Sequence, residues 1–131
     1  MFGLLLGMAM LAGACNASGG EATADVEALR PEAAEITDLL VKNDWKSVRE
    51  RFDSTMEKGL SEDGLANAWA SVVKEKGAYV SNGKPTQVPK GGDMVVFDTP
   101  TTFERGEMKI RVTLRSDGKI AGLFILVPDA N

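Results

Sequence analysis

The sequence predicts a single α+β domain in which N-terminal helices pack on a curved antiparallel sheet. Two observations favour this class. Apolar residues recur with a helical period over residues 31–77, and they alternate with a period of two over residues 94–127. Helices followed by a run of strands indicate a sheet with its helices gathered on one face. A length of 131 residues fits one such domain.

The first helix is expected from Pro31 onward. Ala33, Ile36 and Leu40 fall on one face of a helix with charged residues around the rest. Pro31 suits the first turn, where its missing N–H has no partner to lose. The helix is therefore expected to begin at Pro31 and to bury one apolar face.

Two further helices are expected before the sheet. Residues 43–44 interrupt the first period, and an i, i+3, i+7 spacing then predicts a short helix through Trp45, Val48 and Phe52. The third helix has clearer ends, since Ser61 can cap its N-terminus and Gly77 can stop it. Its apolar stripe is formed by Leu65, Trp69, Val72 and Val73.

The second half of the chain predicts an antiparallel meander. A strand over 78–80 runs into the turn-rich residues 81–85, and two longer strands over 94–103 and 108–115 flank a turn at Arg105-Gly106. A two-residue loop there would place Phe103 opposite Met108 and Phe97 opposite Leu114, with the apolar residues of both strands on one side.

The final strand, over 119–127, has an ambiguous register. A two-residue Asp-Gly loop would turn Ala121, Leu123 and Ile125 toward the core. A three-residue loop with Gly118 in the left-handed conformation would instead turn inward Ile120, Gly122, Phe124 and Leu126. We favour the three-residue loop, because it buries the larger side chains. Either way, the strand has apolar residues on both faces, and the face away from the core needs a cover.

The N-terminal segment indicates export. Residues 1–14 are apolar and uncharged but shorter than the roughly 20 residues that span a bilayer, as in a secretory signal. Leu11-Ala12-Gly13-Ala14-Cys15 resembles the lipobox of bacterial lipoproteins, in which the cysteine thiol takes the lipid. We therefore expect a signal peptide over 1–14, a lipid-anchor cysteine at Cys15 with a linker to residue 24, and one domain over 25–131. This predicts a lipid-anchored protein on the extracytoplasmic face of a bacterial cell membrane.

Composition excludes several chemistries. The chain has 15 Lys+Arg, 19 Asp+Glu, no His and one Cys, for a net charge of −4. Without His there is no His–carboxylate triad and no imidazole-ligated zinc, and one Cys permits no internal disulfide. The acidic balance argues against nucleic acid as a partner. No cofactor and no metal site are expected, and neither 61–64 nor 116–119 supplies the oxygen ligands of a calcium loop.

The order of several motifs resembles a family of domains of unknown function. The motifs are residues 33–40, Asp44-Trp45, Phe52-Asp53, Leu60-Ser61, Leu65, Trp69 and residues 117–124. That family occurs in bacterial lipoproteins and ahead of some α/β-hydrolase domains. The resemblance covers residues 31–127 and is most specific at Asp-Gly-Lys-Ile-Ala-Gly-Leu-Phe, residues 117–124. It implies a nuclear transport factor two-like or cystatin-like cone, a bent sheet around a long helix, and it implies no catalytic residues.

The candidate pocket residues are Trp69, Tyr79, Phe97 and Asp98. An Asp in an apolar pocket has a raised pKa and can act as a base, so Asp98 with Tyr79 would form the acid–base pair of a small enzyme, with Arg111 as charge partner. The favoured hypothesis is instead a binding or accessory module without catalysis. Its expected partners are the membrane, through the anchor, and a small apolar ligand, an envelope protein or a second copy.

Overall fold

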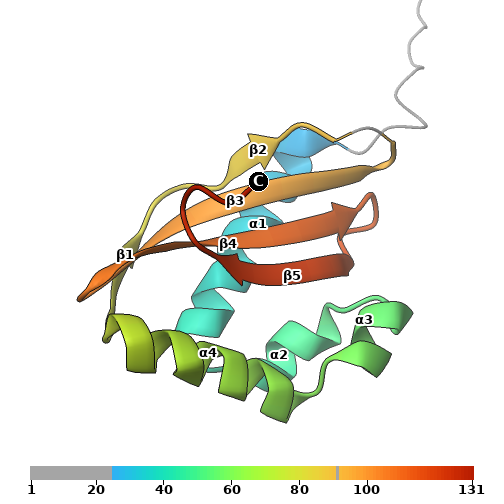
Figure 1. Cartoon of the computed structure of the whole chain (residues 1–131). Coiled ribbons are helices and arrows are strands. Elements are labelled where there is room, and N and C mark those ends of the chain that lie inside the picture. Colours follow the sequence, from blue (N-terminus) through green and yellow to red (C-terminus); the bar gives the residue numbers. More distant parts are fainter. Residues whose placement is uncertain (1–24, 91) are drawn as a thin grey trace, which may run out of the picture.

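The computed structural model describes residues 25–90 and 92–131, which form one antiparallel sheet of five strands and four helices. The strands pair in the order β1–β3–β4–β5, and β2 pairs with β3 beside β1. Figure 1 shows α1 behind the sheet and α2, α3 and α4 along the β5 side. This confirms the predicted α+β class, and the open sheet is consistent with a nuclear transport factor two-like fold. The elements are α1 Val26–Val41, α2 Trp45–Glu50, α3 Ser54–Gly59, α4 Glu62–Lys76, β1 Tyr79–Asn82, β2 Thr86–Val88, β3 Met94–Phe103, β4 Gly106–Arg115 and β5 Ile120–Leu126.

Helix α1 begins earlier than its sequence predicts. Asp25 caps it by accepting a hydrogen bond from the Ala28 N–H (3.2 Å), and Pro31 lies inside the helix. The expectation of a start at Pro31 was wrong, because the capping carboxylate supports a first turn upstream of the proline. Pro31 is exposed in the second turn of the helix, where it removes the N–H that would donate to the Glu27 carbonyl.

The two ends of helix α4 confirm the cap and the stop predicted from its sequence. The Ser61 hydroxyl accepts from the Gly64 N–H (3.0 Å) and Gly77 ends α4 with φ +87°, as expected from those two residues. Helix α3 was not predicted. Asp53 caps it by accepting from the Met56 N–H (2.9 Å), in a segment without apolar periodicity.

The β3–β4 hairpin turns one residue earlier than expected, which shifts the pairing of the two strands by two residues. Its loop is Glu104-Arg105, so Phe103 pairs with Gly106 and Phe97 pairs with Val112. The turn residues are held by the end of α4: the Arg105 N–H donates to the Lys76 carbonyl (2.6 Å). A slip of two residues keeps every side chain on its predicted face, so the core residues were correct although the pairing was not.

Strand β5 combines the two registers that its sequence allowed. Gly118 has φ +88° and forms the favoured three-residue loop, which places Ile120 in the core opposite Leu114. A bulge then leaves Ala121 without an opposite residue. Beyond it Leu123 and Ile125 face the core side, while Phe124 is exposed on the other face. The prediction that Phe124 and Leu126 point inward was therefore wrong.

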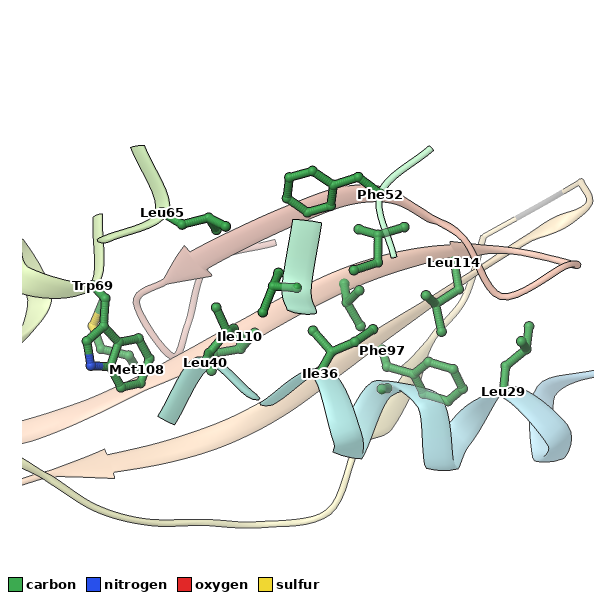
Figure 2. Close-up of a cluster of buried hydrophobic side chains, with 14 of the residues drawn as sticks. Leu29, Ile36, Leu40, Phe52, Leu65, Trp69, Phe97, Met108, Ile110 and Leu114 are labelled. Atoms are coloured by element: carbon green, nitrogen blue, oxygen red, sulfur yellow. The ribbon is translucent and has the colours of Figure 1, made fainter. Parts of the chain in front are cut away.

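One apolar core lies between α1 and the sheet. Its buried members come from α1, α2, the connection between α2 and α3, α4 and the core face of β3, β4 and β5. Figure 2 shows ten of them: Leu29, Ile36, Leu40, Phe52, Leu65, Trp69, Phe97, Met108, Ile110 and Leu114. The core brings helix α4 and strand β5 together at its open side, and this is where the candidate site lies.

Candidate functional site

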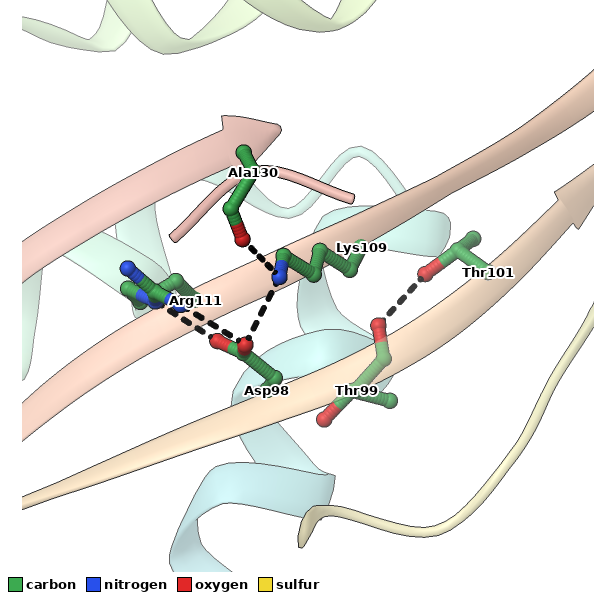
Figure 3. A network of polar contacts seen from close by, with 6 residues as sticks. All are labelled: Asp98, Thr99, Thr101, Lys109, Arg111 and Ala130. Carbon is green, nitrogen blue, oxygen red and sulfur yellow. Dashed lines mark hydrogen bonds and ion pairs between the residues drawn. The ribbon is translucent and has the colours of Figure 1, made fainter. Parts of the chain in front are cut away.

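Asp98 lies on the outer face of the sheet, away from α1. Its two carboxylate oxygens accept hydrogen bonds from the Arg111 guanidinium, at 2.8 Å from Nε and 2.9 Å from the terminal nitrogen. Lys109 Nζ lies 3.2 Å from the same carboxylate (Figure 3). The sequence correctly suggested Arg111 as a charge partner, since the two residues pair directly across β3 and β4.

This ion cluster fixes the charge state of Asp98. Burial raises the pKa of the carboxyl, but the hydrogen bonds and attraction from Arg111 and Lys109 outweigh burial and hold the pKa below its usual range. This is the opposite of the raised pKa expected for an Asp in an apolar pocket. Asp98 is instead a carboxylate near neutral pH, and both of its oxygens already accept from Arg111 or Lys109, so it is a poor proton acceptor.

The end of the chain covers part of the outer face. After β5 it turns back, and the Ala130 carbonyl accepts a hydrogen bond from Lys109 Nζ (Figures 1 and 3). A cavity of about 220 Å³ remains beside the cluster, lined by Thr86, Asp98, Pro100, Glu107, Met108, Lys109 and Pro128. The C-terminal residues thus supply part of the cover that the apolar residues on both faces of the final strand were expected to need.

Tyr79 belongs to an aromatic cluster on the other side of the sheet. Its ring centroid lies 6.5 Å from that of Trp69 and 6.1 Å from that of Phe103. Burial, and secondarily the charge of Asp38, raise the pKa of the Tyr79 phenol, whose hydroxyl donates to the Asn82 side-chain carbonyl. Tyr79 is therefore neutral and held in place at physiological pH.

The structure does not bring the four candidate pocket residues together. Tyr79 pairs with Phe103, whose side chain is on the core face of β3, whereas Asp98 is on the outer face of the same strand. The sheet separates them, so they cannot act as an acid–base pair. Phe97 is fully buried in the core, with the Arg30 guanidinium 5.4 Å from its ring centroid. Trp69 alone of the four lines the groove described next.

An apolar groove of about 160 Å³ lies between β5 and α4. No ionisable side chain lines it; its walls are Leu40, Leu60, Leu65, Ala68, Trp69, Val72, Leu123 and Ile125. Five of these residues come from α4 or the segment just before it, and Leu123 and Ile125 come from β5. We call this the β5–α4 groove. Its composition suits an apolar group and offers no side chain for acid–base or metal chemistry.

Polar contacts hold the connection from α3 to α4, which carries Leu60 of the groove lining. The Arg49 side chain donates to the Leu60 carbonyl (3.0 Å) and to the Glu57 carbonyl (2.8 Å), which fixes the connection from α3 to α4. The Arg115 side chain donates to the Asp53 carboxylate (2.9 Å). The Met56 N–H and then Arg115 lower the pKa of Asp53, so this link between α3 and the sheet is ionic at neutral pH.

The groove was not predicted as a site. The sequence indicated that the face of β5 away from the core needs a cover, but that face carries Phe124, whereas Leu123 and Ile125, which line the groove, face the core side. The remaining walls come from three separate segments, and their convergence depends on long-range packing that no local pattern shows.

Other predicted features fall outside this geometry. Cys15 and the expected signal peptide and linker lie outside the described residues. Within 25–90 and 92–131, no three His, Cys, Asp or Glu side chains are grouped so that they could hold a metal ion. No helix in that part of the chain is long and apolar enough to cross a membrane.

Comparison with known proteins supports the fold and identifies a family. The chain is similar to a protein from Ruminococcus gnavus ATCC 29149 solved by NMR, with a TM-score of 0.56 and 18% identity over 76% of this chain and 90% of that one. At this identity the likeness concerns the fold alone. No match was found among curated proteins. The family described as Protein of unknown function (DUF3887) matches residues 33–123, which is more than half of the chain. The chain therefore belongs to the DUF3887 family of proteins of unknown function.

Proposed function

We propose that this protein is a lipid-anchored extracytoplasmic module that binds an apolar group in the β5–α4 groove. Cys15 would carry the lipid, residues 16–24 would act as the tether, and the domain over 25–131 would present the groove. The observation that carries the binding proposal is a partly open cavity beside an edge strand, lined by apolar side chains with no ionisable group among them.

A binding role agrees better with the geometry than acid–base catalysis by the residues first considered. Asp98 is tied to Arg111 and Lys109, and Tyr79 packs on the far side of the sheet. Among the side chains that line the groove, the indole N–H of Trp69 is the one polar group, and it is a hydrogen-bond donor with no acid–base function near neutral pH. Apolar contact and shape are what this site offers a ligand.

The binding proposal can be tested with toluene and two matched variants. An apolar cavity of about 150 Å³ is known to hold benzene, so toluene fits the groove in size. The full chain carrying Cys15→Ser would be titrated with toluene while the amide NMR signals of Leu123 and Ile125 are followed. Ala68→Phe fills the groove, whereas Asn67→Phe adds the same ring at an exposed position of α4 outside the lining.

We expect saturable shifts in the parent and in Asn67→Phe, and at least tenfold weaker binding in Ala68→Phe. Equal toluene binding in the two Phe variants, or none in the parent, would overturn the groove as a binding site.

The anchor is tested separately by mass spectrometry of the protein extracted from bacterial membranes. We expect a mature N-terminus at Cys15 bearing a lipid, and loss of membrane association in Cys15→Ser. Recovery of an unmodified N-terminus upstream of Cys15 would show that the anchor proposal is wrong. Because the two tests use different readouts, either half of the proposal can fail without the other.

A further inference from the structure

We propose that the natural occupant of the β5–α4 groove is an extended polypeptide segment that adds to the open edge of β5 as a further strand and inserts one large apolar side chain into the groove. This inference rests on the proposed binding role of the groove and names its ligand class. It is carried by the main chain of β5 together with the lining of the groove.

The backbone of β5 presents hydrogen-bonding groups away from β4. On β4, the Arg115 N–H donates to the Lys119 carbonyl (2.9 Å). The backbone N–H and C=O groups of every second residue point to the same neighbour, so those of Arg111 and Lys109 also point toward β5. These two residues pair with Phe124 and Leu126. Leu123 and Ile125 alternate with these residues, and their N–H and C=O groups therefore point to the outer edge.

Nothing in the described part of the chain takes up these edge groups. Beyond Ile120, strand β5 pairs only with β4 in the described part of the chain, and no backbone hydrogen bond of residues 25–90 and 92–131 reaches Leu123 or Ile125 from the other side. An open edge of this kind is the template on which extended peptides add.

The same edge already accepts an extended segment at its beginning. The Ile120 N–H donates to the Arg51 carbonyl (2.7 Å), and the Asp53 N–H donates to the Ile120 carbonyl (2.9 Å), forming a parallel bridge between Phe52 and Ile120. The chain then leaves the edge to form α3. A docked strand at Leu123 and Ile125 would continue this existing interface along the unused length of β5.

The two edge residues also line the groove, which sets the chemistry of the ligand. The side chains of Leu123 and Ile125 face the core side and form one wall, opposite Trp69 and Val72 of α4. A strand paired with them places alternate side chains over the same cavity. A volume of about 160 Å³ admits one aromatic or branched aliphatic side chain, so the segment should alternate polar and apolar residues around one such anchor.

The experiment uses the peptide acetyl-Thr-Val-Thr-Phe-Thr-Val-Thr-amide, its relatives with Leu, Ile or Tyr in place of Phe, and two methylated analogues of the tightest binder. One analogue carries an N-methyl group on the central apolar residue, the other on the adjacent Thr. Only one of these amides faces β5: that of the apolar residue in an antiparallel arrangement, that of the Thr in a parallel one. Binding to the full chain with Cys15→Ser is measured by NMR titration.

We expect one analogue to bind about tenfold more weakly or worse and the other to stay within about threefold of the parent peptide, because only one loses a main-chain hydrogen bond. The peptide should also lose binding in Ala68→Phe and keep it in Asn67→Phe. The inference is wrong if no peptide binds with Kd below 1 mM, or if the two analogues bind equally. It is also wrong if a dimer of this chain occupies Leu123 and Ile125 without peptide. If toluene still binds saturably alongside any of these results, the groove remains a binding site for an apolar group and only the peptide as its ligand is rejected.

Discussion

The two faces of the β3–β4 hairpin differ completely although they alternate along the same strands. On the core face Phe97 pairs with Val112, and both side chains are buried under the helices. One residue further, Asp98 pairs with Arg111 on the outer face, where the Asp98 side chain is only 14% exposed. Both faces are shielded from water, one by hydrocarbon and the other by an ion cluster and the end of the chain.

This comparison shows where binding capacity remains. The core face is filled, and the charged groups of the outer face at Asp98, Lys109 and Arg111 are paired with one another. The β5–α4 groove lies at the edge, where neither cover reaches. The charged residues that first suggest chemistry in the sequence thus stabilise the sheet, whereas the open apolar site comes from residues that resemble ordinary core.

The strongest test of the core face is Phe97→Ala. The side chain is fully buried, so its removal leaves a cavity, and we expect the free energy of unfolding to fall by about 4 kcal/mol. Urea denaturation at neutral pH measures this. Phe124→Ala is the matched control on the outer face, where the ring is 55% exposed and the expected loss is below about 1 kcal/mol. Similar losses in the two variants would contradict the assignment of faces.

The outer face is tested by Asp98→Asn. The variant leaves Arg111 and Lys109 without their anion in a partly buried position, and we expect a loss of about 2 kcal/mol at pH 7, between the values for exposed and buried pairs. Glu75→Gln, at an exposed position of α4, is a control that should change stability by less than about 0.5 kcal/mol. An unchanged midpoint in Asp98→Asn would show that the cluster contributes no stability.

The pH dependence gives the same cluster a second readout. Since the pKa of Asp98 is lowered in the folded protein, the cluster stabilises the fold above the unfolded value of about 4 and loses this contribution as pH falls toward the lower folded value. The parent should therefore lose more stability than Asp98→Asn in that range. Parallel pH profiles for the two proteins would contradict the lowered pKa.

Much of the fold could be predicted because its signals are local. A cap at Ser61 and a glycine at Gly77 delimit α4 whatever the rest of the chain does. The period of two assigned faces correctly along β3 and β4 even though the loop was misplaced, since a slip of two residues preserves the faces. Asp98 and Arg111 could be associated for the same reason.

What could not be predicted depends on distant contacts. The bulge at Ala121 reverses the faces of β5 beyond Ile120, whose backbone is held by the connection between α2 and α3. That pairing joins segments far apart in sequence and has no signature in either. The β5–α4 groove was missed for the same reason, because Leu40, Leu60 and Leu123 come together only in the folded chain.

The core face of β3 also carries two buried threonines, which sharpen the comparison. Thr99 is buried, and its hydroxyl has no hydrogen-bond partner among the described residues. Thr101, two residues along the same face, is equally buried, but its hydroxyl donates to the Thr99 carbonyl at 3.2 Å (Figure 3). The two threonines therefore differ in hydrogen bonding and in little else.

Thr99→Val should stabilise the protein by about 1 kcal/mol, because it replaces an unpaired buried hydroxyl with a methyl group of similar size. Thr101→Val should instead destabilise it by about 1 kcal/mol, since it removes a hydrogen bond that is made. Thermal denaturation of the two variants measures the difference, and its sign is the informative quantity. If Thr99→Val is the more destabilising change, the Thr99 hydroxyl of the parent protein binds a partner such as a buried water. The core face would then contain water in spite of its apolar side chains.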